Sequence, residues 1–417
     1  MSDINLTHDF PKSSEADWRV LVEKGLRGAE FDSLTRQTDD GITRGPLSTS
    51  SESPDSFGTY PRMEAPLLDG RPWHITAPVR GPEIAHANSQ ALEDLSGGAS
   101  ALRLSLGEAG VGIKNANEMK RLLDKVYTDL IPIVVAPNND LANADLIKDF
   151  RDANIFLGLS PKTEGLKSLA QTAPNTWRLI TINAARVHDT GGTEAQELAY
   201  FAASAAHAYR VLGQDAAKHL GVELTANQDG HLTIAKLRAA RRIYARIAES
   251  FGVSDAPLYI HVITSKRMMQ GTDPWTNMLR IMSAGFGAVI GGADFMTTRP
   301  FTDATGHATG FGHRIARNMQ LMMMEESHLG QVKDAAYGSY FHERMTNALS
   351  QAAWTEFQQI ESEGGLANIE PFKARIKKAA TARKEKAAPI LGVNLHPLKQ
   401  DSTAFQEAKI RRSHHES

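Results

Sequence analysis

TDPWTNMLRIMSAGFGAVIGGADFMTTRPF, residues 272–301, is the stretch from which the architecture of the chain is predicted. Apolar residues recur every three to four positions between Asn277 and Phe286, which predicts a helix. The run Ala288–Ala293 is short, apolar and rich in glycine, which predicts a buried parallel strand. A helix that leads directly into such a strand is typical of the closing unit of a wound α/β domain.

The chain before this stretch repeats the same alternation of strands and helices. Seven more short apolar runs are predicted strands, with helical patterns between them: Trp73–Ala77, Leu102–Leu106, Ile131–Ala136, Ile155–Leu159, Arg178–Asn183, Gly221–Ala226 and Leu258–Thr264. Eight strands that alternate with helices over roughly 230 residues favour a (β/α)8 barrel. A doubly wound open sheet would show the same alternation, so periodicity alone leaves both architectures open.

A methionine-rich helix is predicted on the C-terminal side, from Phe311 to Leu329. One face of this helix is predicted to hold Phe311, Ile315, Met319, Met322 and Met323. Three consecutive methionines, Met322–Met324, could suggest a cofactor site. We interpret them as fillers of a core that surrounds the helix on more than one side, because methionine adapts to irregular gaps.

A basic helix is predicted from His231 to Phe251. Its basic residues are Lys236, Arg238, Arg241, Arg242 and Arg246. We interpret them as a solvated or ion-paired surface rather than as a phosphate site. The helix after the fifth strand opens with Thr193 and Gln196 at the spacing of a capping box.

The composition excludes several classes of function. The chain has 417 residues, a formal net charge of −2 and no cysteine. It therefore has no disulfide, no thiolate metal site and no cysteine nucleophile. The balanced charge does not favour binding of nucleic acid or of an acidic membrane. No run approaches the roughly 20 apolar residues of a membrane span, and the N-terminus lacks the pattern of a signal peptide, so we expect a cytoplasmic protein.

Candidate site residues follow from the rule that a barrel carries its active site at the C-terminal ends of its strands. They are Asn183, Arg186, His188 and Asp189 after the fifth strand, Ser265, Lys266 and Arg267 after the seventh, and Asp294, Thr297, Thr298 and Arg299 after the eighth. His188 is the candidate general acid or hydrogen-bond donor. A lone histidine at such a position more often has a structural role.

No motif for a bound cofactor or metal is found. The glycines of Gly107–Gly112 have the wrong spacing for a dinucleotide fingerprint, and the histidines cluster only at His414–His415. No convincing zinc-ligand set is present. We therefore predict neither a cofactor-binding residue nor a metal ligand in this chain.

Four ordered segments carry a resemblance to a known family: DPWTNMLR, GAVIGGADFMTTRPF, RIARNMQLMMMEESHL and AAYGSYFHERMTNALSQAAWTEFQQIESEGG. They resemble the coenzyme-A-dependent acyl mutases, typified by methylmalonyl-CoA mutase, and weaker matches extend from Asp17 to Asn394. The GGAD sequence followed by a proline–phenylalanine pair is most similar to the small (β) subunit of the heterodimeric enzymes. The resemblance implies the barrel rather than the open sheet.

The resemblance also implies an organisation of the chain. Residues 1–70 would form an N-terminal arm that contacts the partner subunit, residues 71–365 the mutase-like barrel, and residues 366–417 a helical extension and tail. The family's cobalamin-binding domain follows the barrel. Only about two dozen residues follow Asn394, so we expect no such domain in this sequence.

The family's catalytic motifs are eroded. Catalytic chains bind adenosylcobalamin and thread an acyl-CoA through the barrel, with a histidine after the fifth strand. Here His188 lies two residues closer to Gly191 than that pattern requires, and Tyr60 cannot be placed in the family's tyrosine motif. Residues 264–270 replace a histidine-containing motif, and Arg186 stands where the cobalt-binding motif needs aspartate.

Three hypotheses follow. The first is a small, non-catalytic subunit of a heterodimeric adenosylcobalamin-dependent methylmalonyl-CoA mutase, an isomerase whose large subunit holds the cofactor and the acyl-CoA. The second is a catalytic barrel that uses a separate cobalamin-binding polypeptide. The third is a scaffold or regulatory barrel without cobalamin chemistry, or a barrel enzyme with new chemistry at Lys266, Arg267 and Asp294. Side chains that fill the barrel axis would count against the second.

Overall fold

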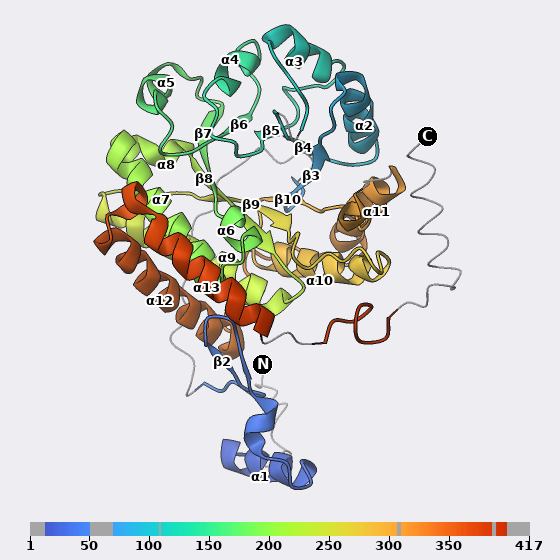
Figure 1. The fold of residues 1–417 in the computed structure, drawn as a ribbon, viewed down its shortest axis with the longest axis vertical. Helices are drawn as coiled ribbons and strands as arrows, with labels where there is room; N and C mark the ends of the chain where they lie inside the picture. The colour runs from blue at the N-terminus through green and yellow to red at the C-terminus, as the bar shows by residue number, and fades with distance from the viewer. Residues whose placement is uncertain (1–12, 51–69, 108–109, 307–309, 386–388, 398–417) are drawn as a thin grey trace, which may run out of the picture.

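The computed structural model describes residues 13–50, 70–107, 110–306, 310–385 and 389–397. At its centre is a closed barrel of parallel strands in the order β10-β3-β4-β5-β6-β7-β8-β9 (Figure 1). The strands are β3 (His74–Val79), β4 (Ala101–Leu104), β5 (Ile133–Val135), β6 (Ile155–Leu159), β7 (Trp177–Asn183), β8 (Leu220–Ala226), β9 (Tyr259–Thr264) and β10 (Phe295–Thr297). The closed order confirms the predicted (β/α)8 barrel and excludes the open sheet.

Helices surround the barrel and connect its strands. They are α2 (Ile84–Ser96), α3 (Ala116–Leu122), α4 (Asn143–Ile147), α5 (Leu166–Thr172), α6 (Ala185–Asp189), α7 (Glu194–Leu212), α8 (Ala216–His219), α9 (Gly230–Ser250), α10 (Thr276–Ile290) and α11 (Gly310–Leu321). Two further helices follow, α12 (Tyr340–Ser362), which packs against α7 and α9, and α13 (Glu370–Glu385). The predicted capping box of Thr193 and Gln196 is present at the start of α7. No described helix combines the length and apolar character needed to cross a membrane.

The eighth strand lies later in the chain than predicted. Helix α10 continues to Ile290, and β10 begins only at Phe295. The small residues at the end of α10 let it approach α9 closely, since a Cβ added to Gly287 would lie 2.7 Å from the Cα of Gly230. The prediction of a strand over Ala288–Ala293 was therefore wrong, because the first half of that apolar run belongs to the packed end of α10.

The methionine-rich helix changes its pitch part-way. After α11 the chain forms a π-helical turn, η5 (Met322–Glu326). Met323 and Met324 are buried in the core, as the filler interpretation predicts, but Met322 is 45% exposed. The buried face of α11 is instead formed by His313, Ala316 and Gln320, which Met323 continues, whereas Phe311, Ile315 and Met319 are only half-buried. The predicted face was therefore wrong by about one residue in its direction.

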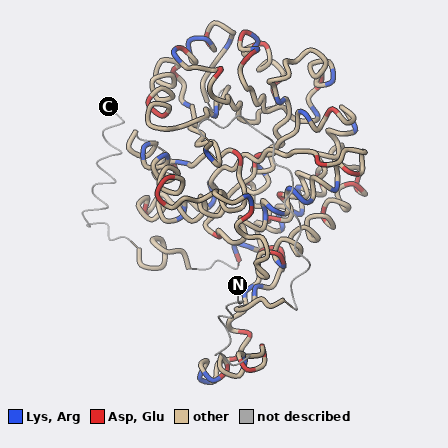
Figure 2. Tube along the Cα trace, turned by 180° about the vertical axis from the view of Figure 1, so that it is seen from behind, with Lys and Arg blue, Asp and Glu red and all other residues tan. Residues whose placement is uncertain are grey.

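The basic residues of α9 are more buried than expected. Lys236 is fully buried and pairs with Glu197 of α7 at 2.7 Å. Arg238 is also buried and pairs with Glu343 of α12 at 2.7 Å. The solvated-face interpretation is wrong for these residues, because α7 and α12 cover this side of α9, whereas the ion-pair interpretation holds. Over the described residues, acidic and basic residues are interspersed (Figure 2).

The N-terminal arm has two parts. Helix α1 (Glu15–Gly25) buries none of its residues and projects away from the barrel (Figure 1). The hairpin of β1 (Arg36–Gln37) and β2 (Thr43–Arg44) instead docks on the barrel helices. At its turn, Asp39 pairs with Arg383 of α13, and the Asp40 carboxylate accepts a hydrogen bond of 3.3 Å from the backbone N of Ala195. The first segment of the described chain is thereby attached to one of the last.

Candidate functional site

Aromatic side chains fill the axis of the barrel. The Phe156 ring lies 4.5 Å from the Tyr259 ring and 4.8 Å from the Phe295 ring, measured between centroids, in edge-to-face contacts. His74 stacks on Phe295 at 4.8 Å. These rings come from β3, β6, β9 and β10, and all of them are buried. With Ala101 and Val134, the three aromatic residues form a core cluster separate from the one between strands and helices.

A glycine makes room for the largest ring. A Cβ added to Gly221 of β8 would lie 1.8 Å from the Tyr259 ring, so no side chain fits there without displacing it. The Tyr259 hydroxyl hydrogen-bonds Thr181 of β7. Gly221 and Tyr259 are adjacent in the parallel ladder of β8 and β9. The barrel is therefore built around this ring rather than around an open channel.

A polar layer lies above the aromatic one, two residues further along the strands. Arg103 of β4 donates two hydrogen bonds to the Glu223 carboxylate of β8, at 2.8 and 3.0 Å. His261 Nε2 lies 2.8 Å from the Thr297 hydroxyl. Burial lowers the pKa of His261 to about 4, so this ring is neutral at neutral pH. Burial alone would raise the pKa of Glu223, but Arg103 outweighs it and the pKa is lowered, which keeps the ion pair charged.

His188 lies in the wall of the barrel. It is fully buried on α6, and its Nε2 is 2.8 Å from the Ser265 hydroxyl at the end of β9. Its Nδ1 lies 3.9 Å from a Glu197 oxygen and has no hydrogen-bond partner among the residues that the structure describes. Burial lowers the pKa of His188 well below its usual value, and Lys236 lowers it further. A catalytic role for His188 stays a prediction, and a buried neutral ring that faces α7 does not favour it.

The other predicted site residues are dispersed. Asp294 lies at the start of β10, where it pairs with Arg241 at 2.8 Å, so it is at the opposite end of the barrel from Lys266 and Arg267. The hypothesis of shared chemistry among these three residues does not fit that separation. Arg267 donates to the backbone O of His188 at 2.8 Å, and Lys266 is exposed.

The remaining candidates at the eighth strand have partners within the fold. Thr297 contacts His261, and the Thr298 hydroxyl accepts a hydrogen bond from Gln320 at 3.1 Å. The Arg299 side chain donates to the backbone O of Thr264 at 3.0 Å. The contacts of Thr297 and Arg299 join the C-terminal ends of β9 and β10. Tyr60 lies outside the described residues.

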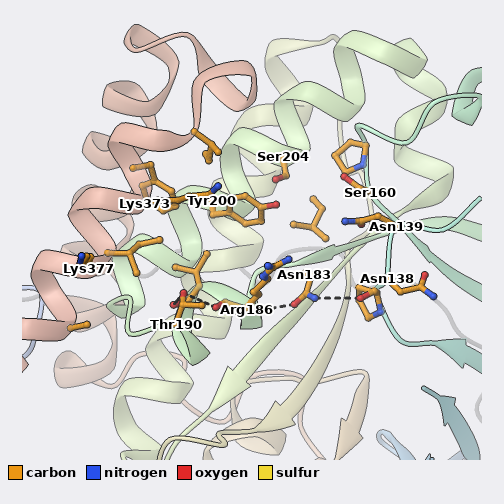
Figure 3. A pocket seen from close by; sticks show the side chains of 18 residues that line it. Asn138, Asn139, Ser160, Asn183, Arg186, Thr190, Tyr200, Ser204, Lys373 and Lys377 are labelled. Carbon is orange, nitrogen blue, oxygen red and sulfur yellow. Dashed lines mark hydrogen bonds between the residues drawn. The ribbon is translucent and has the colours of Figure 1, made fainter. Parts of the chain in front are cut away.

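A cavity of about 570 Å³ lies beside the barrel, beneath α13. It is bounded by the ends of β5, β6 and β7, by α7 and by α13 (Figure 3). Among its lining residues are Asn138, Asn183, Arg186, Ser204, Phe372 and Ile376. Two predicted site residues, Asn183 and Arg186, are thus brought together here rather than on the barrel axis.

Comparisons with known proteins agree on a family. The family described as Methylmalonyl-CoA mutase matches residues 160–417. A methylmalonyl-CoA mutase small subunit of Streptomyces virginiae is 34% identical over 95% of this chain and 72% of its own length. A probable methylmalonyl-CoA mutase small subunit of Mycobacterium tuberculosis, strain H37Rv, is 35% identical over 87% of this chain and 66% of its own length. The chain belongs to the methylmalonyl-CoA mutase family.

A structural comparison adds little to this assignment. YagE of Escherichia coli K12, a prophage protein of the dihydrodipicolinic acid synthase family, matches with 14% identity and a TM-score of 0.27 over 84% of this chain and 99% of its own. A TM-score this low carries no argument. The predicted resemblance to the mutase family is therefore confirmed by the sequence relatives, and the barrel by the strand order.

In this mutase-family chain, His188 does not fit the role of a cobalt ligand. A cobalt ligand needs an accessible ring nitrogen, whereas His188 is buried and its Nε2 already contacts Ser265. Within the described ranges, no group of three or more His, Cys, Asp or Glu side chains could hold a metal ion. The residues at this position fit a packed wall better than a cofactor site.

Sequence reasoning missed the polar layer of this mutase-family barrel. Arg103, Glu223 and His261 each lie within an otherwise apolar strand run. A polar residue at an inward position of a predicted barrel strand was the available signal, since a buried charge needs a partner. Placing the three residues in one layer would have required the strand register.

Proposed function

We propose that this chain is the small, non-catalytic subunit of a heterodimeric adenosylcobalamin-dependent methylmalonyl-CoA mutase, located in the cytoplasm. The complex would interconvert methylmalonyl-CoA and succinyl-CoA, with the acyl-CoA and the cofactor on the large subunit. This chain would stabilise that subunit. Two relatives named as small subunits support the proposal, and the filled barrel axis is the observation that carries it.

The filled axis makes a catalytic role costly. An acyl-CoA threaded through the barrel would have to displace Phe156, Tyr259 and Phe295 from buried positions. Exposing one such ring costs about 1.5–3 kcal/mol, and breaking the Arg103–Glu223 pair would leave two buried charges without partners. The second hypothesis, a catalytic barrel with a separate cobalamin-binding polypeptide, needs an open axis and is therefore disfavoured.

The N-terminal arm supports a partner-binding role. Val20 and Leu21 on α1 are 64% and 68% exposed, although the helix is fixed at its start by a capping box of Ser14 and Asp17. A helix that carries apolar residues away from its own core has apolar surface to bury on another protein. We propose that residues 1–70 contact the large subunit. The division of the chain into an arm, a barrel and a C-terminal extension, with boundaries at residues 70 and 365, is part of the same proposal.

Co-purification tests the proposal. The full chain would be produced alone and together with a large mutase subunit, and succinyl-CoA conversion would be assayed with added adenosylcobalamin. We expect no activity from the chain alone and an active stoichiometric complex with the partner. Turnover by this chain with only a separate cobalamin-binding polypeptide would overturn the non-catalytic assignment.

A pair of variants tests the arm. The double variant Val20→Ser/Leu21→Ser should lose co-purification with the large subunit, because it removes the exposed apolar residues of α1. Tyr127→Ser is a matched control, since Tyr127 is 74% exposed on the barrel body. Equal recovery of both variants with the partner would exclude the arm as the contact and would favour the scaffold hypothesis.

A further inference from the structure

The cavity beneath α13 is separate from the barrel axis. Tyr200 and Ser204 line it from one turn of α7, and Phe372 and Ile376 line it from one turn of α13 (Figure 3). None of these residues belongs to the axial cluster. Its volume of about 570 Å³ falls within the range of small-molecule sites. The side chains that fill the barrel axis therefore do not determine whether the cavity beneath α13 binds a ligand.

A buried hydroxyl in the cavity wall lacks a partner. Ser204 is 1% exposed, and its Oγ makes no hydrogen bond within the described chain. A serine in a helix commonly satisfies its hydroxyl on the preceding turn, and Ser204 does not. Buried polar groups are normally paired. An unpaired hydroxyl beside an open cavity is available to a polar atom of a molecule bound there.

The rim of the cavity is cationic. Within the described residues, neither the Arg186 guanidinium nor the Lys377 ammonium has an ion-pair partner, whereas Lys373 pairs with Glu370 at 2.6 Å. In Figure 3 the Arg186 side chain extends toward the centre of the group of lining side chains. The Asn183 Oδ1 accepts a hydrogen bond of 3.1 Å from the backbone N of Arg186, which fixes the backbone from which the guanidinium extends. Among the described lining residues, the site thus presents a guanidinium and no carboxylate.

Apolar side chains line the cavity beside these cations. Phe372 and Ile376 are buried where α13 covers the barrel, and Ile182 and Val187 line the cavity from β7 and α6. An apolar wall under a cationic rim matches a molecule with an apolar body and an acidic head group. Guanidinium binds carboxylate and phosphate in the same bidentate manner, so both head groups fit.

We propose that this cavity binds an amphipathic organic anion. Its carboxylate or phosphate contacts Arg186 and Lys377, its apolar body lies against Phe372 and Ile376, and a polar atom of the ligand pairs with the Ser204 hydroxyl. The proposal is independent of the small-subunit role, because it depends only on this chain.

Calorimetric titration of the full chain tests the proposal. The probes are octanoate, octyl phosphate and octan-1-ol, which share an apolar chain and differ in the head group. We expect saturable binding of one molecule of octanoate or octyl phosphate per chain, and the tighter of the two identifies the head group. Octan-1-ol should bind at least about tenfold more weakly, as expected for loss of a charge-assisted contact. Absence of saturable binding by both anions, or equal binding of the alcohol, would overturn the proposal.

Variants on the rim locate the binding site. Arg186→Gln should weaken binding of the anion about tenfold, and Lys377→Gln should weaken it about threefold, since an ammonium contributes a less directional contact. Lys378→Gln is the matched control, because Lys378 is the next residue on α13, is exposed and does not line the cavity. All three residues are exposed, so the variants should remain folded. Unchanged binding by Arg186→Gln, or an equal loss in Lys378→Gln, would contradict the site.

Discussion

The barrel axis and the cavity beneath α13 differ in how their charged groups are paired. On the axis, Arg103 and Glu223 pair with each other across the barrel. Among the described residues, the cavity offers Arg186 no carboxylate partner and the Ser204 hydroxyl no hydrogen-bond partner. The axis also holds an atom unpaired within the described chain, His261 Nδ1, but its two charged groups neutralise each other. Paired charges contribute to the fold, whereas a guanidinium and a hydroxyl without partners beside a cavity are suited to a ligand. The barrel axis, which this fold suggests as the first place to look for a site, is therefore less suited to binding than the cavity beneath α13.

The largest expected effect comes from breaking the axial ion pair. Arg103→Met should lower the free energy of unfolding by about 3–5 kcal/mol, because Glu223 is left buried and charged. Arg186→Met is the matched control and should change it by less than about 0.5 kcal/mol. Urea unfolding measures both. Equal losses in the two variants would remove the contrast between the axis and the cavity.

A smaller effect is expected from crowding the aromatic layer. Gly221→Ala should cost about 3 kcal/mol, because the new Cβ would collide with the Tyr259 ring. Gly112→Ala is the control, since a Cβ there meets no atom within 4 Å and its φ is not positive. Thermal and urea unfolding compare the two variants. A Gly221→Ala protein as stable as the control would mean that the axis has spare room.

Two serines test the difference between a paired and an unpaired hydroxyl. Ser265→Ala should cost about 1–2 kcal/mol, because it removes the partner of buried His188. Ser204→Ala should leave the free energy of unfolding unchanged or slightly raise it, since no hydrogen bond within the described chain is lost. Urea unfolding of the two variants side by side checks this. A Ser204→Ala loss as large as that of Ser265→Ala would show that Ser204 is satisfied within the fold.

The smallest effect is expected in the pH dependence of stability, because burial and Arg103 act on the Glu223 pKa in opposite directions. The folded-state pKa of Glu223 is lowered from 4.5, so its ionised form stabilises the fold above that pH and the stabilisation is lost as pH falls through the folded pKa. Unfolding of the parent protein and of Glu223→Gln, followed from about pH 7 to about pH 3, should show a shallower acid slope in the variant. Identical slopes would contradict the ion-pair assignment.

The sequence predicts much of the fold because strand runs in a parallel barrel are locally apolar. Leu258–Thr264 and Ile155–Leu159 were placed to within a residue of the observed strands. The eighth strand was misplaced because Ala288 and Gly291 serve the packing of α10 against α9, and such a packed helix end has the same composition as a buried strand. Local pattern cannot distinguish the two without the neighbouring helix.

The candidate site is less predictable because it is assembled from distant segments. The strand-end rule found Asn183 and Arg186, but their joint role depends on α13, which folds back over β5, β6 and β7. The burial of His188 depends on Ser265 and Glu197, which lie on other elements. No local pattern reports the missing partner of Ser204, since that requires knowing every atom around it.

The docked hairpin of the N-terminal arm has a consequence for the order in which the protein matures on the ribosome. Asp39 is joined to Arg383, 344 residues later. At roughly 5–20 residues per second, translation takes about 17–70 s to cover that separation. The hairpin therefore leaves the ribosome long before α13, and its bond to Arg383 forms only after the bond between Asp40 and Ala195 has become possible. Throughout that interval the exposed Val20 and Leu21 of α1 can meet a partner that is already folded, so assembly can begin before synthesis ends.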